Sequence, residues 1–264
     1  MVFGGFYQRL LIESYFFIFV DNPNKFDFPL AAQNINGAFK WAIFICKFCI
    51  HNFSLGGVKM IFKVEVMGVF ATNSYFYIDE ETNSGFLIDP GAQADKLLRI
   101  IDQRKFNIEK ILLTHGHFDH ISAAPEIQRA LNIPICMQKN GYLYAKNPAW
   151  SHAKITLENV TYLEDDSEII LAANPDFKLK IIPVAGHTAD GAMYYSAKDN
   201  VAFVADSIFK GSYGRTDLEG GDEIALFKNI KEKILTLPEE TILLSGHTPP
   251  TTVRIEKYRP WYNH

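Results

Sequence analysis

A stretch of seven residues, T-H-G-H-F-D-H at positions 114–120, constrains this chain more than any other feature. It places three histidines and an aspartate within six positions. The apolar run directly before it, residues 110–113, predicts a buried strand. If the chain continued in extended geometry, His115, His117 and Asp119 would point to one side. The sequence therefore predicts a group of polar side chains at the end of a strand, a usual place for a functional site.

The side chains of this stretch are the ligands that zinc and similar divalent ions prefer. Burying them without partners would be costly, so packing alone does not account for the cluster. Gly116 has no side chain, and we expect the backbone to bend there so that neighbouring ligands converge. With His120 the stretch offers four candidate ligands, which is more than one ion needs from one loop. This surplus predicts two metals that share a site.

Three later strands each end at one more candidate ligand. An alternating strand is followed by His187, the apolar strand 201–205 ends in Asp206, and the apolar residues 242–244 precede His247. A carboxylate at the end of an apolar strand is unfavourable unless it has a partner. Together with the first cluster, these residues complete a ligand set.

This set resembles that of the metallo-β-lactamase superfamily, over about Met60 to the end of the chain. The resemblance implies an α/β fold of mixed α+β kind, a four-layer αβ/βα sandwich with the site at one edge between two central sheets. It also implies two divalent metal ions. The first would be held by His115, His117 and His187, the second by Asp119, His120 and His247, and Asp206 would bridge the two.

Within the superfamily, four segments resemble the single-domain, glyoxalase-II-like hydrolases: residues 73–75, 89–91, 211–222 and 246–252. The resemblance implies a hydrolase of the hydroxyacylglutathione-hydrolase type, acting on a small acyl-thiol substrate. A hydroxide shared by the two metals would attack the acyl carbon, and Asp119 could orient it as a catalytic residue. The histidine-rich set favours zinc, with iron or manganese as alternatives.

Two departures from the family pattern stand out. The family usually has Gly-Asp-Thr where this chain has Ala205-Asp206-Ser207, which keeps the ligand. Full-length glyoxalase II enzymes also carry a C-terminal helical domain that helps bind glutathione, and this chain ends about a dozen residues after Thr252. Arg215 lies where those enzymes place a basic residue that binds the thiol. A surface salt bridge explains Arg215 equally well.

Other activities remain open on the same scaffold. One alternative is a lactonase-like hydrolase. Another is an iron-dependent sulfur (persulfide) dioxygenase, because that family shares the Gly-Arg-Thr-Asp stretch of residues 214–217 but uses a single iron. A non-enzymatic metal- or thiol-binding protein is a third class, which an intact ligand set disfavours. β-Lactamase activity is less favoured, because fold does not fix substrate and the closer motifs point elsewhere.

Composition excludes several kinds of partner. A net charge of −4 gives no electrostatic reason to expect nucleic acid or an anionic membrane as a partner. The apolar content of 48% is enough for a substantial core. Three cysteines do not form a disulfide framework, which predicts a reducing compartment and hence a cytoplasmic protein. The sequence does not indicate an oligomeric state.

The first 59 residues do not fit the pattern of the rest. They are rich in Phe, their apolar runs are too short to span a bilayer, and no cleavage site of a signal peptide follows. Cys46 and Cys49 form a C-x-x-C without a second pair that would complete a zinc site. Residues 55–60 are what a ribosome-binding site would encode if translated. We therefore interpret 1–59 as a disordered extension or a misplaced start, and 60–264 as the domain.

From Met60 onward, strands and helices alternate without a repeat or a linker. Cys136 is expected to be a small buried apolar residue. The predicted strands cover 60–66, 73–78, 85–88, 110–113, 133–137, 168–172, 177–184, 201–206 and 242–245, and the predicted helices 92–104, 123–131 and a short one from 141.

Overall fold

The computed structural model describes residues 18–19, 59–146 and 155–259. Most of the predicted extension, including Cys46 and Cys49, lies outside these residues. The described pair Ile18–Phe19 forms a short strand, β1, parallel to the strand that begins at Lys59. No helix in the described ranges combines the length and the apolar character needed to cross a bilayer.

The first sheet orders its strands β1-β2-β3-β4-β5-β6-β7. The pairs β2–β3 and β3–β4 are antiparallel, and the pairs from β4 to β7 are parallel. Every residue of β3 after Ala71 is buried, as expected for a strand covered on both faces. The remaining strands are β2 (Lys59–Met67), β3 (Ala71–Asp79), β4 (Ser84–Ile88), β5 (Asn107–Leu113), β6 (Ile135–Gln138) and β7 (Val160–Leu163).

The second sheet has the order β15-β14-β11-β10-β9-β8. Its strands are β8 (Glu168–Ile170), β9 (Lys178–Pro183), β10 (Ala192–Ser196), β11 (Val201–Ala205), β14 (Ile242–Ser245) and β15 (Thr251–Thr252). In β9 the buried Leu179 and Ile181 alternate with the exposed Lys178 and Lys180, so one face meets the core and the other meets water. A separate hairpin consists of β12 (Ile208–Phe209) and β13 (Ser212–Tyr213).

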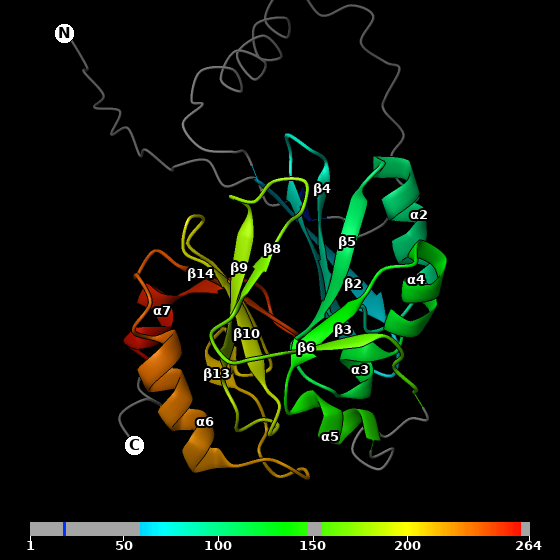
Figure 1. The fold of residues 1–264 in the computed structure, drawn as a ribbon. Coiled ribbons are helices and arrows are strands. Elements are labelled where there is room, and N and C mark those ends of the chain that lie inside the picture. The colour runs from blue at the N-terminus through cyan, green and yellow to red at the C-terminus, as the bar shows by residue number, and fades with distance from the viewer. Residues whose placement is uncertain (1–17, 20–58, 147–154, 260–264) are drawn as a thin grey trace, which may run out of the picture.

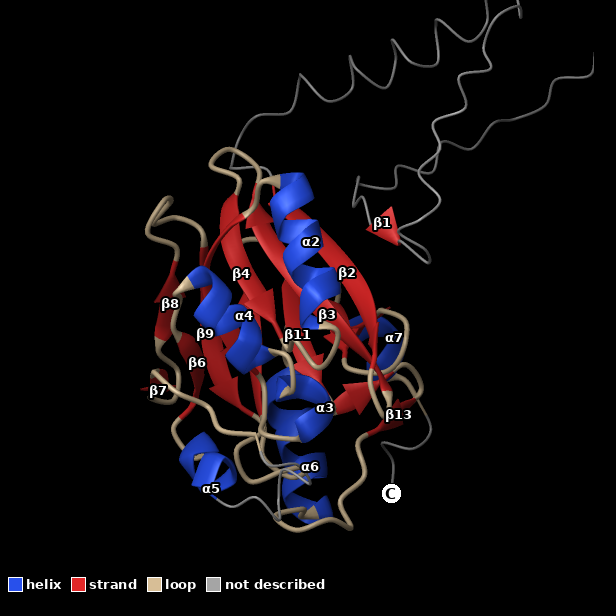
Figure 2. Cartoon of the chain, turned by 90° about the vertical axis from the view of Figure 1, so that its right-hand side faces the viewer, coloured by secondary structure: helices blue, strands red, loops and turns tan. Residues whose placement is uncertain are grey.

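Helices cover the outer faces of both sheets, and the two sheets face each other in the middle (Figure 1). Figure 2 shows α2 and α4 lying over the first sheet; in Figure 1, α6 and α7 lie outside the second sheet. The helices are α2 (Ala94–Arg104), α3 (Phe118–Ile121), α4 (Ala124–Leu131), α5 (Gly141–Lys146), α6 (Glu223–Asn229), the π-helical η1 (Ile230–Ile234) and α7 (Val253–Lys257). The predicted four-layer sandwich is confirmed.

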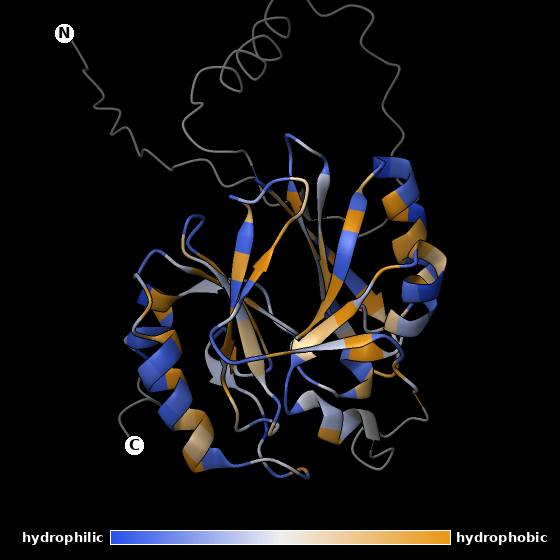
Figure 3. Ribbon diagram, viewed as in Figure 1, coloured by the Kyte–Doolittle hydropathy of each residue, from blue (hydrophilic) through white to orange (hydrophobic). Residues whose placement is uncertain are grey.

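Three apolar cores separate these four layers. One packs α2 and α4 on the first sheet through residues such as Leu97 and Ile127. The second lies between the sheets, where Tyr77 stacks on Phe177 with ring centroids 4.3 Å apart. The third packs α6 and η1 on the second sheet. In Figure 3 the covering helices carry both hydrophilic and hydrophobic residues, as one buried face requires.

The ends of the central strands meet at one edge of the sandwich. β11 and β14 are parallel neighbours, so Asp206 and Gly246 leave the second sheet side by side. Residues of the first sheet fasten this edge. Asn73 Nδ2 donates hydrogen bonds to the carbonyl oxygens of Ser245 and Thr248, at 2.9 and 3.0 Å, and the Tyr75 hydroxyl donates to Ser245 O at 2.7 Å. The two sheets are therefore locked together beside the predicted ligands.

Most predicted elements are present within a few residues, and Cys136 is buried, as expected. The prediction assigned no element to β7, β10, α6 or α7. The N-terminus of α6 carries a signal that marks it, because the side chain of Asp222 accepts a hydrogen bond from Ala225 N at 2.9 Å.

Candidate metal centre

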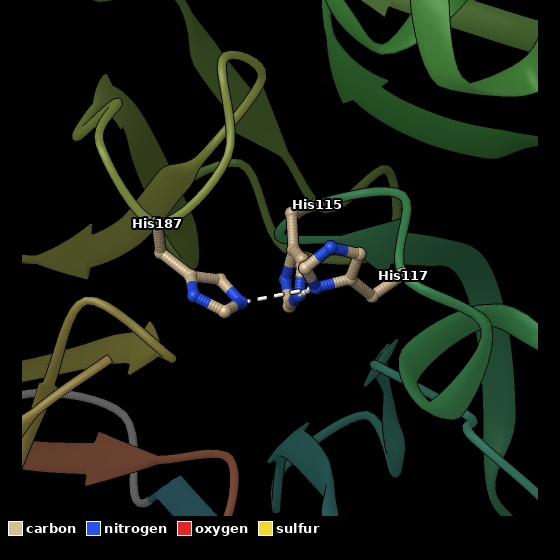
Figure 4. A group of neighbouring side chains, drawn as sticks. All are labelled: His115, His117 and His187. Atoms are coloured by element: carbon tan, nitrogen blue, oxygen red, sulfur yellow. Dashed lines mark hydrogen bonds between the residues drawn. The ribbon is translucent and has the colours of Figure 1, made fainter. Parts of the chain in front are cut away.

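Three buried histidines converge just beyond the ends of β5 and β9. The Nε2 atoms of His115 and His187 lie 3.1 and 3.0 Å from Nδ1 of His117 (Figure 4). His115 and His117 follow β5, and His187 follows β9 from the opposite sheet. We call these three residues the histidine triad.

Gly116 is required between the first two histidines for a reason that the sequence did not show. It does not have a positive φ. A Cβ atom at this position would lie 2.4 Å from Cβ of Tyr144. The close approach of α5, and not an unusual backbone conformation, therefore excludes a side chain here.

The expectation of continued extended geometry through Asp119 is wrong. The extended chain ends at His117, and a single helical turn, α3, begins at Phe118. In a helix, consecutive side chains diverge by about 100° rather than 180°. Asp119 and His120 can therefore both reach the centre from adjacent positions, which a strand would not allow.

A second group of ligands lies beside the first. His247 Nε2 is 3.3 Å from Asp119 Oδ2, and His120 Nε2 is 3.8 Å from the same oxygen. His120 is fully buried, whereas the side chain of His247 is 26% exposed. We call Asp119, His120 and His247 the mixed triad.

Asp206 lies between the two triads. Its Oδ2 is 3.6 Å from His187 Nε2 and 3.1 Å from His247 Nε2, and its Oδ1 is 3.5 Å from His120 Nε2. Each triad places its three ligand atoms within 4.8 Å of one another. His115, His120 and Asp206 form an overlapping group that meets the same limit. The structure thus brings all seven predicted ligands together, with Asp206 where a bridging residue would lie.

The chemistry of these atoms fits divalent cations. His120 Nε2 and Asp206 Oδ1 are buried and have no hydrogen-bond partner, which is costly in a protein interior without a cation. The nitrogen pairs of the histidine triad face each other at about hydrogen-bond distance. A Cβ on Gly246 would lie 2.2 Å from Asp206 Oδ1, so the chain leaves this space to the carboxylate.

Asp89 supports ligands of both triads. Its Oδ2 accepts hydrogen bonds from His120 Nδ1 at 2.9 Å and from Thr114 Oγ1 at 2.6 Å. Thr114 Oγ1 in turn lies 3.1 Å from Nδ1 of His115. Such contacts fix the tautomer and orientation of a metal-binding histidine, so Asp89 is a site residue. The sequence interpretation placed residues 89–91 among the segments that resemble glyoxalase-II-like hydrolases but gave Asp89 no role in the site. The sequence did contain a signal for Asp89, because an acidic residue directly follows the apolar β4. The same pattern identified Asp206 as a candidate ligand.

The backbone of Arg215, rather than its guanidinium, supports a ligand. His187 Nδ1 donates to Arg215 O at 2.7 Å, and His247 Nδ1 donates likewise to Ala71 O at 2.7 Å. The Arg215 side chain is exposed and forms two 2.7 Å hydrogen bonds with Asp217. Its predicted role in binding the substrate stays a prediction.

The two triads differ in charge. Burial lowers the pKa of His117 to about 3, and burial also lowers the pKa of His115 and His187, so this triad offers neutral imidazoles. Burial works in the same direction on His247, but hydrogen bonds to Asp119 and Asp206 outweigh it and raise its pKa to about 10. Without a cation, the proton on His247 therefore compensates negative charge of the Asp119 and Asp206 carboxylates.

A pocket of about 570 Å³ opens onto this centre. Five ligands line it: His117, Asp119, His187, Asp206 and His247. The rest of its wall is largely aromatic and aliphatic, and Arg215 lies on it too. A small substrate in this pocket would contact both triads.

Comparison with known proteins decides the family. Residues 67–247 match the model of the metallo-β-lactamase superfamily. The chain belongs to this superfamily. The match extends from the end of β2 to the last predicted ligand, His247.

Three similar proteins illustrate the range of this superfamily. The hydroxyacylglutathione hydrolase GloC of Haemophilus influenzae is 31% identical over 203 residues, which are 74% of this chain and 95% of GloC. The crystal structure of the BLEG-1 B3 metallo-β-lactamase is 30% identical, with a TM-score of 0.71 over 78% of this chain and all of that one. The structure of TTHA1623 in a di-iron-bound form is also 30% identical, with a TM-score of 0.60 and the same coverage. Family, ligand cluster and relatives together make this chain a metal-dependent hydrolase.

Proposed function

We propose that this chain hydrolyses thioesters of small hydroxy acids with two divalent cations held by the histidine and mixed triads. The observation that carries the proposal is the position of Asp206, whose carboxylate lies within 3.6 Å of histidine nitrogens from both triads. The similarity to a hydroxyacylglutathione hydrolase supports the thioester.

Zinc is the metal we propose, because imidazole nitrogens dominate the ligand set. Iron is the alternative, since a relative of 30% identity has been crystallised with two irons. When bound, such cations supply an activated water and polarise an acyl oxygen. Hydrolysis adds water to the acyl carbon, breaks the carbon–sulfur bond and leaves a proton on the departing sulfur.

The protein's own groups hold the reacting parts in place. Burial opposes ionisation of Asp119, but the hydrogen bond from His247 lowers the pKa of this carboxyl. Asp119 is therefore a carboxylate at neutral pH and can accept a hydrogen bond from the attacking water. Its Oδ2 is also within 3.5 Å of Thr72 Oγ1, which limits its rotation. The contacts of His187 and His247 with backbone oxygens fix their rings before substrate arrives.

β-Lactam hydrolysis is a second candidate, favoured by the 30% identity and complete coverage of a B3 metallo-β-lactamase. Zinc-loaded protein is to be assayed with S-lactoylglutathione, a lactoyl ester of a simple thiol, the matching oxygen ester and a chromogenic cephalosporin. We expect hydrolysis of the thioesters that a chelator abolishes and added zinc restores. Turnover of the cephalosporin alone, by protein that holds two metal equivalents, would assign the second function instead.

A further inference from the structure

We propose that the pocket binds an uncharged, apolar arm of the substrate, aromatic or branched aliphatic, and not an anionic peptide thiol. This inference rests on the proposed thioester hydrolysis, because it names the part of the thioester that does not react. The pocket is continuous with the metal centre, since five of the seven ligands line it. An arm attached to a carbonyl at the centre must therefore lie along its wall.

Aromatic rings approach the centre from three separate segments. Phe70, in the turn between β2 and β3, lies against Phe118 of α3, with ring centroids 5.9 Å apart. Phe209 and Tyr213, from the β12–β13 hairpin, line the same pocket, and the ring of Phe209 lies 6.1 Å from that of His247. Leu218 completes the apolar wall.

The exposure of the Phe70 ring to water at this pocket is unfavourable in free energy. It is 56% exposed, in a turn that presents no charged side chain between Met67 and Ala71. An exposed aromatic ring beside a catalytic centre gains stability when a ligand covers it, because apolar surface leaves water. The turn is thus suited to contact an apolar group.

The side chains of the pocket wall offer little positive charge to an anionic arm. Among the described residues that line it, Arg215 is the one with a permanent positive charge. The Nε and Nη2 atoms of its guanidinium each donate a 2.7 Å hydrogen bond to the carboxylate of Asp217. Glutathione brings two carboxylates, which would have to displace Asp217 or remain unpaired against phenylalanine rings. An uncharged arm neither displaces Asp217 nor leaves a carboxylate unpaired.

Kinetics on matched thioesters test the inference. Lactoyl esters of benzyl mercaptan and of glutathione carry alkyl thiols, and they differ in whether the arm is apolar or anionic. For zinc-loaded protein we expect kcat/KM to be about tenfold higher for the benzyl ester, through a lower KM. In Phe70→Ser this ratio should fall about tenfold. The control is Val69→Ser, because Val69 is 78% exposed in the same turn and does not line the pocket, so the ratio should stay unchanged.

A binding measurement separates failure of this inference from failure of the proposed function. Benzyl methyl sulfide and S-methylglutathione resemble the two arms but cannot be hydrolysed. Titration calorimetry should give tighter binding of benzyl methyl sulfide, weakened by Phe70→Ser and not by Val69→Ser. If no thioester is hydrolysed, the function is wrong, and these titrations still decide what the pocket binds. Equal or tighter binding of S-methylglutathione, or a preference for the glutathione ester, would overturn the inference.

Discussion

The histidine triad and the mixed triad lie side by side but differ in charge and exposure. The histidine triad is buried and neutral, and its three ligand atoms are all imidazole nitrogens. The mixed triad contributes a carboxylate and includes His247, whose side chain is 26% exposed toward the pocket. Both triads line the pocket, through His117 and His187 in one and Asp119 and His247 in the other, but the mixed triad contains the more exposed ligand.

The two triads differ, and the carboxylate of Asp206 lies between them. Among the described residues, Asp206 is the only carboxylate with oxygens within 3.6 Å of histidine nitrogens from both triads. Burial opposes its ionisation, but the charge of His120 and the hydrogen bond and charge of His247 hold its pKa well below the usual range. It therefore supplies negative charge that the neutral histidine triad lacks. Losing it should affect both halves, whereas losing a supporting contact should affect them unequally.

Asp206→Ala is expected to have the largest effect. Removing the shared carboxylate should release metal from both triads and reduce kcat/KM by roughly a thousandfold or more, because metal-assisted charge stabilisation amounts to several kcal/mol. Metal analysis and thioester kinetics on the same preparation provide the measurement. Asp176→Ala, an exposed carboxylate on the loop before β9, serves as the control. If Asp206→Ala kept two metal equivalents, Asp206 would not be a ligand that both triads share.

Asp89→Asn should have an intermediate effect that is larger on the mixed triad. The two oxygens of Asp89 accept from the Thr114 backbone N–H and from His120 Nδ1, and the amide of Asn must turn its NH2 group toward one of these donors. Loss of such support typically weakens metal binding about 10- to 100-fold. Thr114→Val removes the contact to His115 and one hydrogen bond to Asp89 but keeps the contact between Asp89 and His120, so it should weaken the histidine triad more than the mixed triad. Competition with a chromogenic chelator measures both affinities. Identical profiles for the two variants would mean that the triads do not respond separately.

Ala205→Gly should change stability rather than either triad. Ala205 precedes Asp206 with φ of 43°, a left-handed conformation that costs a residue with a Cβ about 1 kcal/mol. Glycine should therefore raise the free energy of unfolding by about 0.5 to 1 kcal/mol, a rise in Tm of roughly 1 to 3 °C. Ala202→Gly, in the same strand, should instead lower Tm, because it only adds flexibility and removes a buried methyl group. Destabilisation by Ala205→Gly would show that this strain is not relieved.

The alternation of strands and helices and the positions of the ligands could be predicted from local patterns, whereas the four-layer sandwich was implied by the resemblance to the superfamily. Apolar strands that end in His187, Asp206 or His247 are visible in the residue order alone. The turn of α3 was not predicted, since four residues carry too little periodicity to distinguish a helix from a loop. The reason for Gly116 was also hidden, because Tyr144 is distant in sequence. Phe70 joins the pocket only once the β2–β3 turn is folded against α3.

The metal content of wild-type protein and of His247→Ala tests the central claim most directly. After dialysis against metal-free buffer, inductively coupled plasma mass spectrometry gives the ratio of metal to protein. A centre with two cations predicts two equivalents in the wild type and one in the variant, which keeps the complete histidine triad and Asp206. One equivalent in both proteins would contradict a dinuclear centre and favour chemistry at a single ion.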